Sequence, residues 1–357
     1  MKKRVLFVNL RLTAGGSERV MALLANGFAD RGIDTEMLIL KEENITYEIN
    51  DKVKLTNCFC PLIGNKIIWH FRRIWSIRKA IIDSGADTII SFMWDINMNV
   101  ILACLGLKKK IVISERADPR NESRKKTFSF ANRWIFPLAD LIVFQTNEVK
   151  EVYSKKCRQK SVVIPNPVNP VANKIDINMN DPVIVAAGRC TEQKNFRMLL
   201  QAFNIFYKNH TEYKLLVLGD GGLRDKLQRE ALNMECGKNV CFLGYVNDPN
   251  KYMQKASIFA SSSNYEGISN SMMEALAMGL PAVCTDCPVG GAAMMIDNDV
   301  NGILVPVNDA KAMSDAFSKI ADNKTFAEML STNSYNRSKD YTITKIVDRW
   351  LSEIGHI

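Results

Sequence analysis

Glu266 and Glu274 lie eight positions apart, on either side of the point where a predicted loop becomes a predicted helix. Apolar residues recur at helical spacing from Met272 to Leu280, which predicts a helix through Glu274 and leaves Glu266 in the preceding loop. A separation of eight is a little over two helical turns, so both carboxylates can face one cleft. Such a pair is suited to hydrogen-bonding the hydroxyls of one polyhydroxylated ligand.

The segment between the two carboxylates can present backbone amides. Gly267 and Ser269 are small, so the amides of Ile268, Ser269 and Asn270 are expected to point outward at the positive end of the helix dipole. Phosphate binds readily at such a helix start. The alternative interpretation is that Glu266 and Asn270 only cap the helix, while the second glutamate is solvated.

Two cations follow another predicted strand, at 182–188. This strand ends at Gly188, and Arg189 and Lys194 come directly after it, at the carboxyl edge where open α/β sheets bind ligands. Two fixed cations suit a diphosphate leaving group. They can stabilise the negative charge that builds on the departing diphosphate, without help from a metal. The alternative is that both are exposed residues at the start of a helix.

Glycine-rich turns occur at two further strand ends. Gly15 and Gly16 lie between the first predicted strand and helix, where a backbone without side chains lets phosphate or sugar approach. Glu18 can equally be a first-turn partner of the helix dipole. Gly219 opens a GDGG turn that lacks the third glycine and the acidic residue of the dinucleotide fingerprint.

Short apolar strands alternate with amphipathic helices along most of the 357 residues. This alternation predicts an α/β protein with mainly parallel sheets, and the length suits two domains. Three prolines and a polar stretch before residue 181 predict a linker. We expect an N-terminal domain at 1–170, a C-terminal domain at 171–335 and a final segment at 336–357, whose helix packs an apolar face on the first domain.

The string from Glu266 to Glu274, together with the Arg189 and Lys194 pair, resembles glycosyltransferase family 4. The resemblance implies a GT-B fold, with two Rossmann-like domains whose parallel sheets face each other across a cleft, and a C-terminal helix that crosses back to the first domain. It also implies retaining, metal-independent transfer from a nucleotide sugar. Arg189 and Lys194 would hold the donor diphosphate, Glu266 the transferred sugar and Glu274 the ribose.

The resemblance extends to weaker motifs. Gly15 and Gly16, followed by Ser and Glu, resemble the GGxE opening of the family, which faces the donor phosphate and the acceptor. The loop at Gly219 and the segment ending at Val246 would flank the base and ribose.

One position departs from the family. Many relatives carry a histidine where this chain has Arg116, so we carry over the location as acceptor-binding and leave the role open, between an acceptor diphosphate and a donor oxygen. Structural pairing of Arg116 with Glu115 or Asp118 is the alternative.

The charge is uneven along the chain. Residues 1–170 carry 28 Lys and Arg against 17 Asp and Glu, and the remainder carries 19 against 21. This bias favours an anionic membrane surface, a polyphosphate-bearing substrate or nucleic acid as partner of the first half. Two stretches, at 66–82 and 124–140, interleave basic, aromatic and aliphatic residues, as interfacial helices do, although a core helix with a solvated basic face is the alternative.

Other features argue against further chemistry. No apolar run is long enough to span a bilayer and the N-terminus is unlike a signal peptide, so we expect a cytoplasmic enzyme, peripheral on the inner face of the membrane. The nine cysteines have no zinc-finger spacing and suggest reduced, mostly buried thiols. Asp297 and Asp299 lie in a polar turn, so no metal and no cofactor are expected.

The sequence therefore predicts a hexosyl- or N-acetylhexosaminyltransferase of bacterial surface-glycan biosynthesis, such as capsule or O-antigen assembly. A UDP-sugar is the expected donor and a lipid-linked or polysaccharide glycan the expected acceptor, with no nucleic acid. The alternatives are a nucleotide-sugar 2-epimerase of the same fold and, from another class, a basic nucleic-acid-binding protein.

Overall fold

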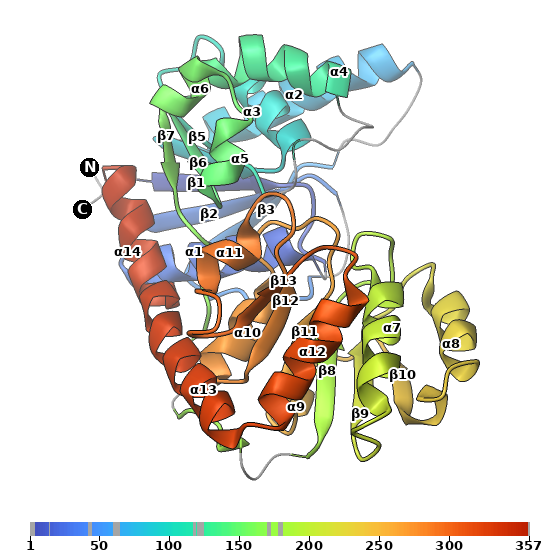
Figure 1. The fold of residues 1–357 in the computed structure, drawn as a ribbon. Coiled ribbons are helices and arrows are strands. Elements are labelled where there is room, and N and C mark those ends of the chain that lie inside the picture. Colours follow the sequence, from blue (N-terminus) through green and yellow to red (C-terminus); the bar gives the residue numbers. More distant parts are fainter. Residues whose placement is uncertain are drawn as a thin grey trace. The chain divides into compact units, whose positions relative to one another are not determined.

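The computed structural model describes residues 4–13, 15–41, 45–59, 65–116, 119, 125–169, 173–177 and 181–355. The chain forms two compact units (Figure 1). The first comprises Met1–Pro167 together with Ile343–Ile357, and the second comprises Val168–Thr342.

The first unit contains a seven-stranded sheet in the order β3-β2-β1-β4-β5-β6-β7, with every neighbouring pair parallel. Its strands are β1 (Arg4–Asn9), β2 (Asp34–Ile39), β3 (Val53–Asn57), β4 (Thr88–Phe92), β5 (Lys110–Ser114), β6 (Leu141–Phe144) and β7 (Ser161–Val163). Its helices are α1 (Gly16–Asp30), α2 (Lys66–Ser84), α3 (Trp94–Cys104), α4 (Lys125–Phe130), the π-helical η2 (Ala131–Ile135), the 3-10 helix η3 (Phe136–Leu138), α5 (Asn147–Glu151), α6 (Lys155–Gln159) and α14 (Ile343–Glu353). The strand order reverses between β1 and β4, so the loops after these strands diverge and leave room for a ligand.

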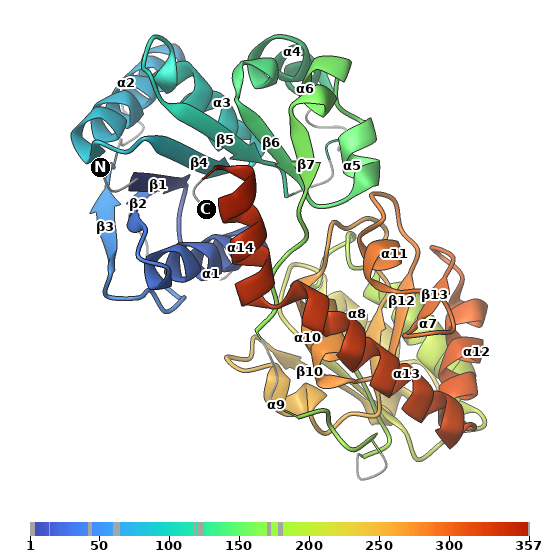
Figure 2. The ribbon, with the colours of Figure 1, turned by 90° about the vertical axis from the view of Figure 1, so that its left-hand side faces the viewer.

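Helix α14 is a part of the first unit although it is last in the sequence. It lies beside α1, as Figure 2 shows. The apolar face predicted for it is buried, with Trp350 fully enclosed. Gly27 lets the two helices approach, because a Cβ there would lie 2.5 Å from a methyl group of Val347. The predicted packing of the C-terminal helix on the first domain is thus confirmed.

The second unit contains a six-stranded parallel sheet in the order β10-β9-β8-β11-β12-β13. Its strands are β8 (Val183–Ala187), β9 (Lys214–Leu218), β10 (Val240–Gly244), β11 (Ile258–Ser261), β12 (Ala282–Thr285) and β13 (Ile303–Val305). Its helices are α7 (Phe196–Tyr207), α8 (Arg224–Leu232), η5 (Gly237–Asn239), α9 (Asn250–Met253), α10 (Asn270–Met278), α11 (Gly291–Met295), α12 (Ala310–Ala321), α13 (Lys324–Ser338) and η6 (Lys339–Tyr341). Here the strand order reverses between β8 and β11, which are hydrogen-bonded neighbours.

The boundaries of the units differ from those predicted. The first unit ends at Pro167 instead of residue 170, and the second runs to Thr342 instead of 335. The second difference arises because α13 continues through residue 335 to Ser338. Residues 170–172, which include the predicted end of the first domain, lie outside the described part of the chain.

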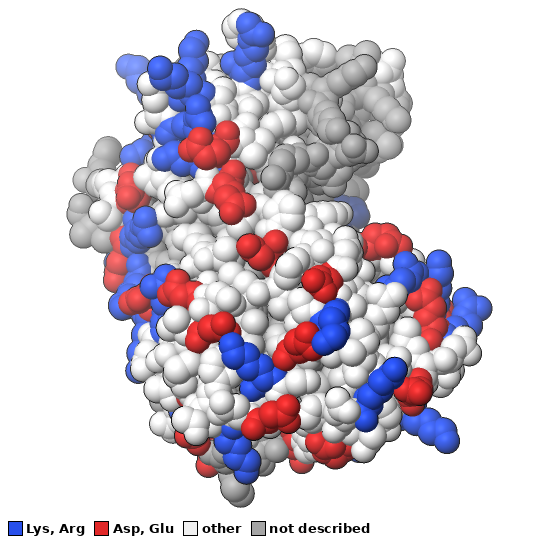
Figure 3. All heavy atoms as spheres, viewed as in Figure 1, with Lys and Arg blue, Asp and Glu red and all other residues white. Residues whose placement is uncertain are grey.

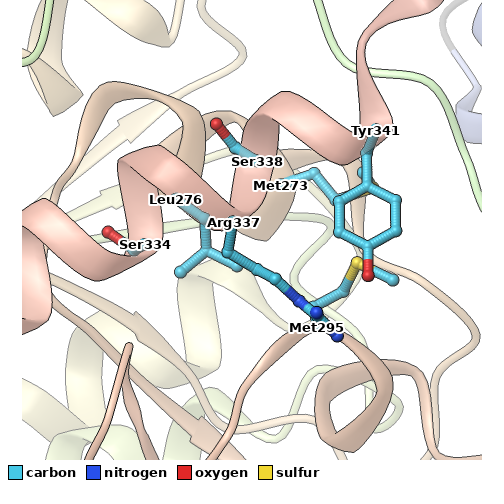
Figure 4. A pocket seen from close by; sticks show the side chains of 7 residues that line it. All are labelled: Met273, Leu276, Met295, Ser334, Arg337, Ser338 and Tyr341. Carbon is cyan, nitrogen blue, oxygen red and sulfur yellow. The ribbon is translucent and has the colours of Figure 1, made fainter. Parts of the chain in front are cut away.

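Helix α10 is held by α13 on one side. Figure 4 shows the side chains that line a small pocket between α10, α11, α13 and η6. The lining residues are Met273, Leu276, Met295, Ser334, Arg337, Ser338 and Tyr341. Because Met273 and Leu276 are buried in this seam, the orientation of α10 on the sheet is fixed by apolar packing.

Candidate active site

Lys194 and Glu266 form an ion pair at the carboxyl edge of the second sheet. Lys194 Nζ lies 2.7 Å from Glu266 Oε1 and 2.5 Å from Oε2, and the two side chains are 13% and 19% exposed. Lys194 belongs to the loop after β8 and Glu266 to the loop after β11. The pair therefore lies between the two strands where the strand order reverses, the position at which open α/β sheets bind ligands.

Hydrogen bonds join the two loops that carry this pair. Ser262 Oγ donates to the carbonyl of Lys194 at 2.8 Å. The main-chain amide of Asn264 donates to the carbonyl of Gln193, and its side-chain amide to the carbonyl of Glu192, each at 2.8 Å. Because both backbones are tied together, the cation and the carboxylate are fixed before any ligand arrives.

Asn195 is a member of this network that the sequence analysis did not single out. Its φ is +45°, a left-handed conformation that asparagine tolerates better than most residues. Its Oδ1 accepts the amide of Met198 and so caps α7, while Nδ2 donates at 2.8 Å to Oδ1 of both Asn264 and Asn308. The signal in the sequence was an N-cap residue directly after Lys194.

A second chain of hydrogen bonds supports Glu266 from below. Ser263 Oγ donates to Glu266 Oε2 at 2.8 Å, and Thr285 Oγ1 donates to the carbonyl of Ser263 at 2.6 Å. Ser263 and Thr285 are both buried. Ser263 lies only three residues before Glu266, whereas Thr285 meets the Ser263 carbonyl because β11 and β12 lie side by side.

Two glycines, Gly188 and Gly219, allow close packing around Lys194. A Cβ on Gly188 would lie 2.8 Å from Cε of Lys194, and a Cβ on Gly219 only 2.0 Å from the carbonyl oxygen of Gly188. Their φ values are +157° and +135°, which also favour glycine. Arg189 is exposed, and no ion pair or hydrogen bond of its side chain with the described residues is present.

Helix α10 begins at the loop of Glu266. Ser269 is the N-cap and its Oγ accepts the amide of Met272, so the alternative in which Glu266 and Asn270 provide the cap is wrong. Glu274 lies in the middle of this helix and is buried at 7% exposure, not solvated. Gly267 and Asn270 are partly buried, and Ile268 is buried.

Two further residues predicted for the donor, Gly219 and Val246, lie in loops at the same edge. Gly219 follows β9 and bridges to Gly244 at the end of β10, which places Val246 in the next loop. The loops after β8, β9, β10 and β11 thus bring together the residues that the sequence analysis assigned to the diphosphate, sugar, ribose and base. Whether each has the assigned role stays a prediction.

Gly291 at the start of α11 is a further residue that the sequence analysis missed. A Cβ there would lie 1.8 Å from the carbonyl oxygen of Gly267. We expect Gly291→Ala to push the Glu266 loop aside, lowering the free energy of unfolding by about 1–3 kcal/mol and reducing turnover. Thermal unfolding and steady-state rates measure both effects.

Gly222 provides the matched control for that substitution. It lies in the same unit, and a Cβ there would meet no atom within 4 Å. Gly222→Ala should therefore leave the free energy of unfolding nearly unchanged. Equal effects of the two alanines would contradict the close contact of Gly291 with the loop.

In the first unit, Glu18 covers the glycines at the start of α1. A Cβ on Gly15 would lie 2.2 Å from Oε2 of Glu18, and Ser17 Oγ donates to the same oxygen at 2.6 Å. Glu18 is buried near the positive end of α1, as the dipole interpretation requires. A carboxylate therefore already occupies the space beside Gly15 that was expected to admit phosphate, whereas Gly16 is exposed.

Arg116 follows β5 at the carboxyl edge of the first sheet. Nη1 of its guanidinium donates to Oδ1 of Asn166 at 2.7 Å. The carboxylate of Glu115 accepts the main-chain amide of Arg116 at 3.0 Å and the hydroxyl of Tyr153 at 3.4 Å. The guanidinium of Arg116 therefore bonds Asn166 and does not pair with Glu115, the first partner of the alternative interpretation. The second, Asp118, lies outside the described residues.

Most of the described cysteines are buried, and Asp297 lies in a turn. The described cysteines form no disulfide, and all but Cys58 and Cys241 are buried. Burial raises the pKa of the Cys287 thiol to about 11. Asp297 accepts the amide of Asn301 in a turn, and no group of three or more His, Cys, Asp or Glu among the described residues is arranged to hold a metal.

The fold and this site define a GT-B glycosyltransferase. Residues 14–171 match the family model described as Glycosyltransferase Family 4, and residues 169–337 match the one described as Glycosyl transferases group 1. Together the two models cover residues 14–337, which include every strand named above except β1. The chain thus combines both kinds of domain, as a glycosyltransferase of the family 4 type.

Two similar proteins come from Campylobacter jejuni. One is a GalNAc-alpha-(1->4)-GalNAc-alpha-(1->3)-diNAcBac-PP-undecaprenol alpha-1,4-N-acetyl-D-galactosaminyltransferase, 27% identical over 99% of each chain. The other is an N-acetylgalactosamine-N,N'-diacetylbacillosaminyl-diphospho-undecaprenol 4-alpha-N-acetylgalactosaminyltransferase, 28% identical over 97% of each chain.

Solved structures share the fold. Sucrose-phosphate synthase from Thermosynechococcus elongatus superposes with a TM-score of 0.85, at 16% identity over 99% of this chain and 98% of its own. HepE from Anabaena, in complex with UDP and glucose, superposes with a TM-score of 0.80, at 16% identity over 99% of this chain and 100% of its own.

Proposed function

We propose that this glycosyltransferase moves an N-acetylhexosamine or hexose, with retention, from a UDP-sugar to a lipid-linked or polysaccharide glycan in bacterial surface-glycan synthesis. The ion pair of Lys194 and Glu266 carries the proposal, because it sets a cation and a sugar-binding carboxylate side by side at the switch point of the second sheet. The names of the Campylobacter relatives support an N-acetylhexosamine and a diphosphate-linked acceptor.

The charges at this edge suit departure of a nucleoside diphosphate. Breaking the bond between sugar and phosphate builds negative charge on the diphosphate, which Arg189, Lys194 and the amides of residues 268–270 can stabilise. These groups supply the role that a metal has in other transferases, so we propose metal-independent transfer. Glu266 orients the sugar, while Glu274 on α10 holds the ribose hydroxyls.

Nucleotide binding tests this assignment. We expect UDP to raise the unfolding temperature more than GDP or ADP does, equally with EDTA and with magnesium, because fixed cations hold its diphosphate. Glu274→Ala should remove most of this shift, since it deletes the ribose contact. Calorimetric titration gives the affinities. If none of the three nucleotides binds, or if only magnesium permits binding, the proposed donor chemistry fails.

We further propose that the first unit works at the inner face of the cytoplasmic membrane. None of the described helices is both long and apolar enough to cross a bilayer. Helix α2 instead exposes an apolar stripe at helical spacing, which consists of Ile68, Phe71, Trp75 and Ile82, each more than half exposed. Such a stripe among basic residues suits an anionic bilayer surface.

A second surface of the first unit has the same character. Phe130 and Trp134 are each 59% exposed, and Trp134 packs beside the guanidinium of Arg133. Hydrogen bonds from Ser154 to Asn132 join η2 to the basic helix α6. In Figure 3, Lys and Arg side chains gather over α6, whereas charges of both signs alternate over the second unit.

Vesicle binding tests the membrane proposal. We expect sedimentation with vesicles that contain phosphatidylglycerol, weakened by added salt because screening reduces the attraction of basic residues. Trp75→Ser should reduce binding by removing an exposed anchor. Leu232→Ser, at a 70% exposed apolar residue of the second unit, is the control. Equal binding to neutral vesicles, or equal effects of both substitutions, would contradict binding of this surface to an anionic membrane.

A further inference from the structure

Arg116 keeps one edge of its guanidinium unused. Nη1 bonds Asn166, but Nε and Nη2 are buried and have no hydrogen-bond partner among the described residues. These two nitrogens lie on the same edge of the guanidinium, and this edge matches two oxygens of a phosphate or carboxylate. The unused edge therefore has the geometry of an anion-binding fork.

Two aromatic rings hold the guanidinium in place. The central carbon of Arg116 lies 4.6 Å from the ring centre of Phe92, at the end of β4, and 5.8 Å from that of Trp350, on α14. Both rings are fully buried. Because aromatic contacts use the faces of the guanidinium, its edges are left for hydrogen bonds.

Asn166 fixes the direction of the fork. Its Oδ1 accepts from Nη1 of Arg116 and from Nε2 of Gln145, each at 2.7 Å. Asn166 and Gln145 are buried, so neither can turn freely. With Nη1 anchored, the guanidinium plane cannot rotate to pair Nε and Nη2 elsewhere.

The two unpaired nitrogens of Arg116 belong to a charged group. Burial lowers the pKa of Arg116 to about 9, with Glu115 opposing the shift, so the group remains mostly protonated at neutral pH. A buried cation with unpaired N–H groups costs free energy. Ligand oxygens would remove that cost, and Arg116 lies after β5, at the sheet edge where ligands bind.

We propose that Nε and Nη2 of Arg116 bind a phosphoryl group, and that this group is the diphosphate of the glycan acceptor. The proposal rests on the proposed function only in taking the acceptor to be diphosphate-linked. The donor diphosphate has the same chemistry, so the test separates the two sources. Phe92 and Trp350 are positioning residues, since they act through the guanidinium.

Calorimetric titrations of geranyl diphosphate and, separately, of UDP test the fork. Arg116→Lys keeps the charge but loses the paired N–H groups, so geranyl diphosphate should bind about tenfold more weakly or worse, with UDP unchanged. Arg31→Lys, at a partly buried arginine of the same unit that pairs with Asp348, is the matched control and should change neither affinity.

Each other outcome is informative. Weaker binding of UDP in Arg116→Lys, with geranyl diphosphate unchanged, overturns the assignment to the acceptor. Unchanged affinity for both compounds overturns the fork itself. If UDP does not bind the wild-type protein but geranyl diphosphate still requires Arg116, the donor proposal fails and this one stands.

Arg116→Met gives a readout that a purely structural role would not. It removes a buried, incompletely paired cation and keeps an apolar stem, so the ligand-free unfolding temperature should stay or rise. The rise in unfolding temperature on adding geranyl diphosphate should be lost. If Arg116→Met unfolds at a lower temperature and still gains the wild-type shift, Arg116 merely holds the two rings and the proposal is wrong.

Discussion

Lys194→Ala is expected to lower turnover on the order of a thousandfold and to weaken UDP binding. The substitution removes a fixed cation from the edge where charge develops on the departing diphosphate. It also leaves Glu266, at 19% exposure, with Ser263 as its remaining side-chain partner in the ion-pair site. Steady-state rates and calorimetric titration with UDP measure the two losses.

Lys319→Ala is the control for loss of a lysine ion pair in the same unit. Lys319 pairs with Asp299 at 2.8 Å, and both side chains are about half exposed. Surface pairs of this kind contribute little, so this variant should keep wild-type turnover and UDP affinity. Wild-type turnover in Lys194→Ala would remove Lys194 from the proposed chemistry.

Glu266→Gln is expected to lower turnover about a hundredfold without weakening UDP binding. Glutamine keeps the shape of the side chain but has one hydrogen-bond acceptor fewer for sugar hydroxyls and no charge. Because the carboxylate now holds Lys194 at 2.5 Å, its loss frees the lysine for the diphosphate. UDP should therefore bind as tightly as to the wild type, or more tightly.

Glu230→Gln controls for loss of a paired carboxylate elsewhere in the unit. Glu230 bonds Arg197 at 2.9 and 3.0 Å, which lowers the pKa of its carboxyl group, and its side chain is 30% exposed. This variant should retain turnover. A loss of UDP affinity in Glu266→Gln as large as in Lys194→Ala would mean that the pair acts as one structural unit, against the separate roles proposed.

Much of the fold follows from local patterns in the sequence. The alternation of apolar strands and amphipathic helices predicted two parallel-sheet domains, and the apolar face at 343–354 predicted a packed final helix. The edge strands β3 and β7 were not predicted, because an edge strand needs little apolar surface: of β3 only Val53 is buried. The predicted end of the second domain, residue 335, lies inside α13. The sequence near it contains no glycine or proline that would mark the end of this helix.

The candidate site was predictable in its parts but not in its contacts. Glu266, Glu274, Arg189 and Lys194 stood out by type, by spacing and by position after predicted strands. The pairing of Lys194 with Glu266 joins residues 72 positions apart, so only the pairing of β8 with β11 decides it. Local periodicity carries no information about such partners.

The fold class, the family resemblance and the residue types at the second sheet edge follow from the sequence alone, because they depend on periodicity and on motifs within short segments. Tertiary structure decided which atoms meet. It brought Gly291 against Gly267 and enclosed Arg116 between Phe92 and Trp350. These contacts join segments distant in the chain, and close packing alone fixes their geometry.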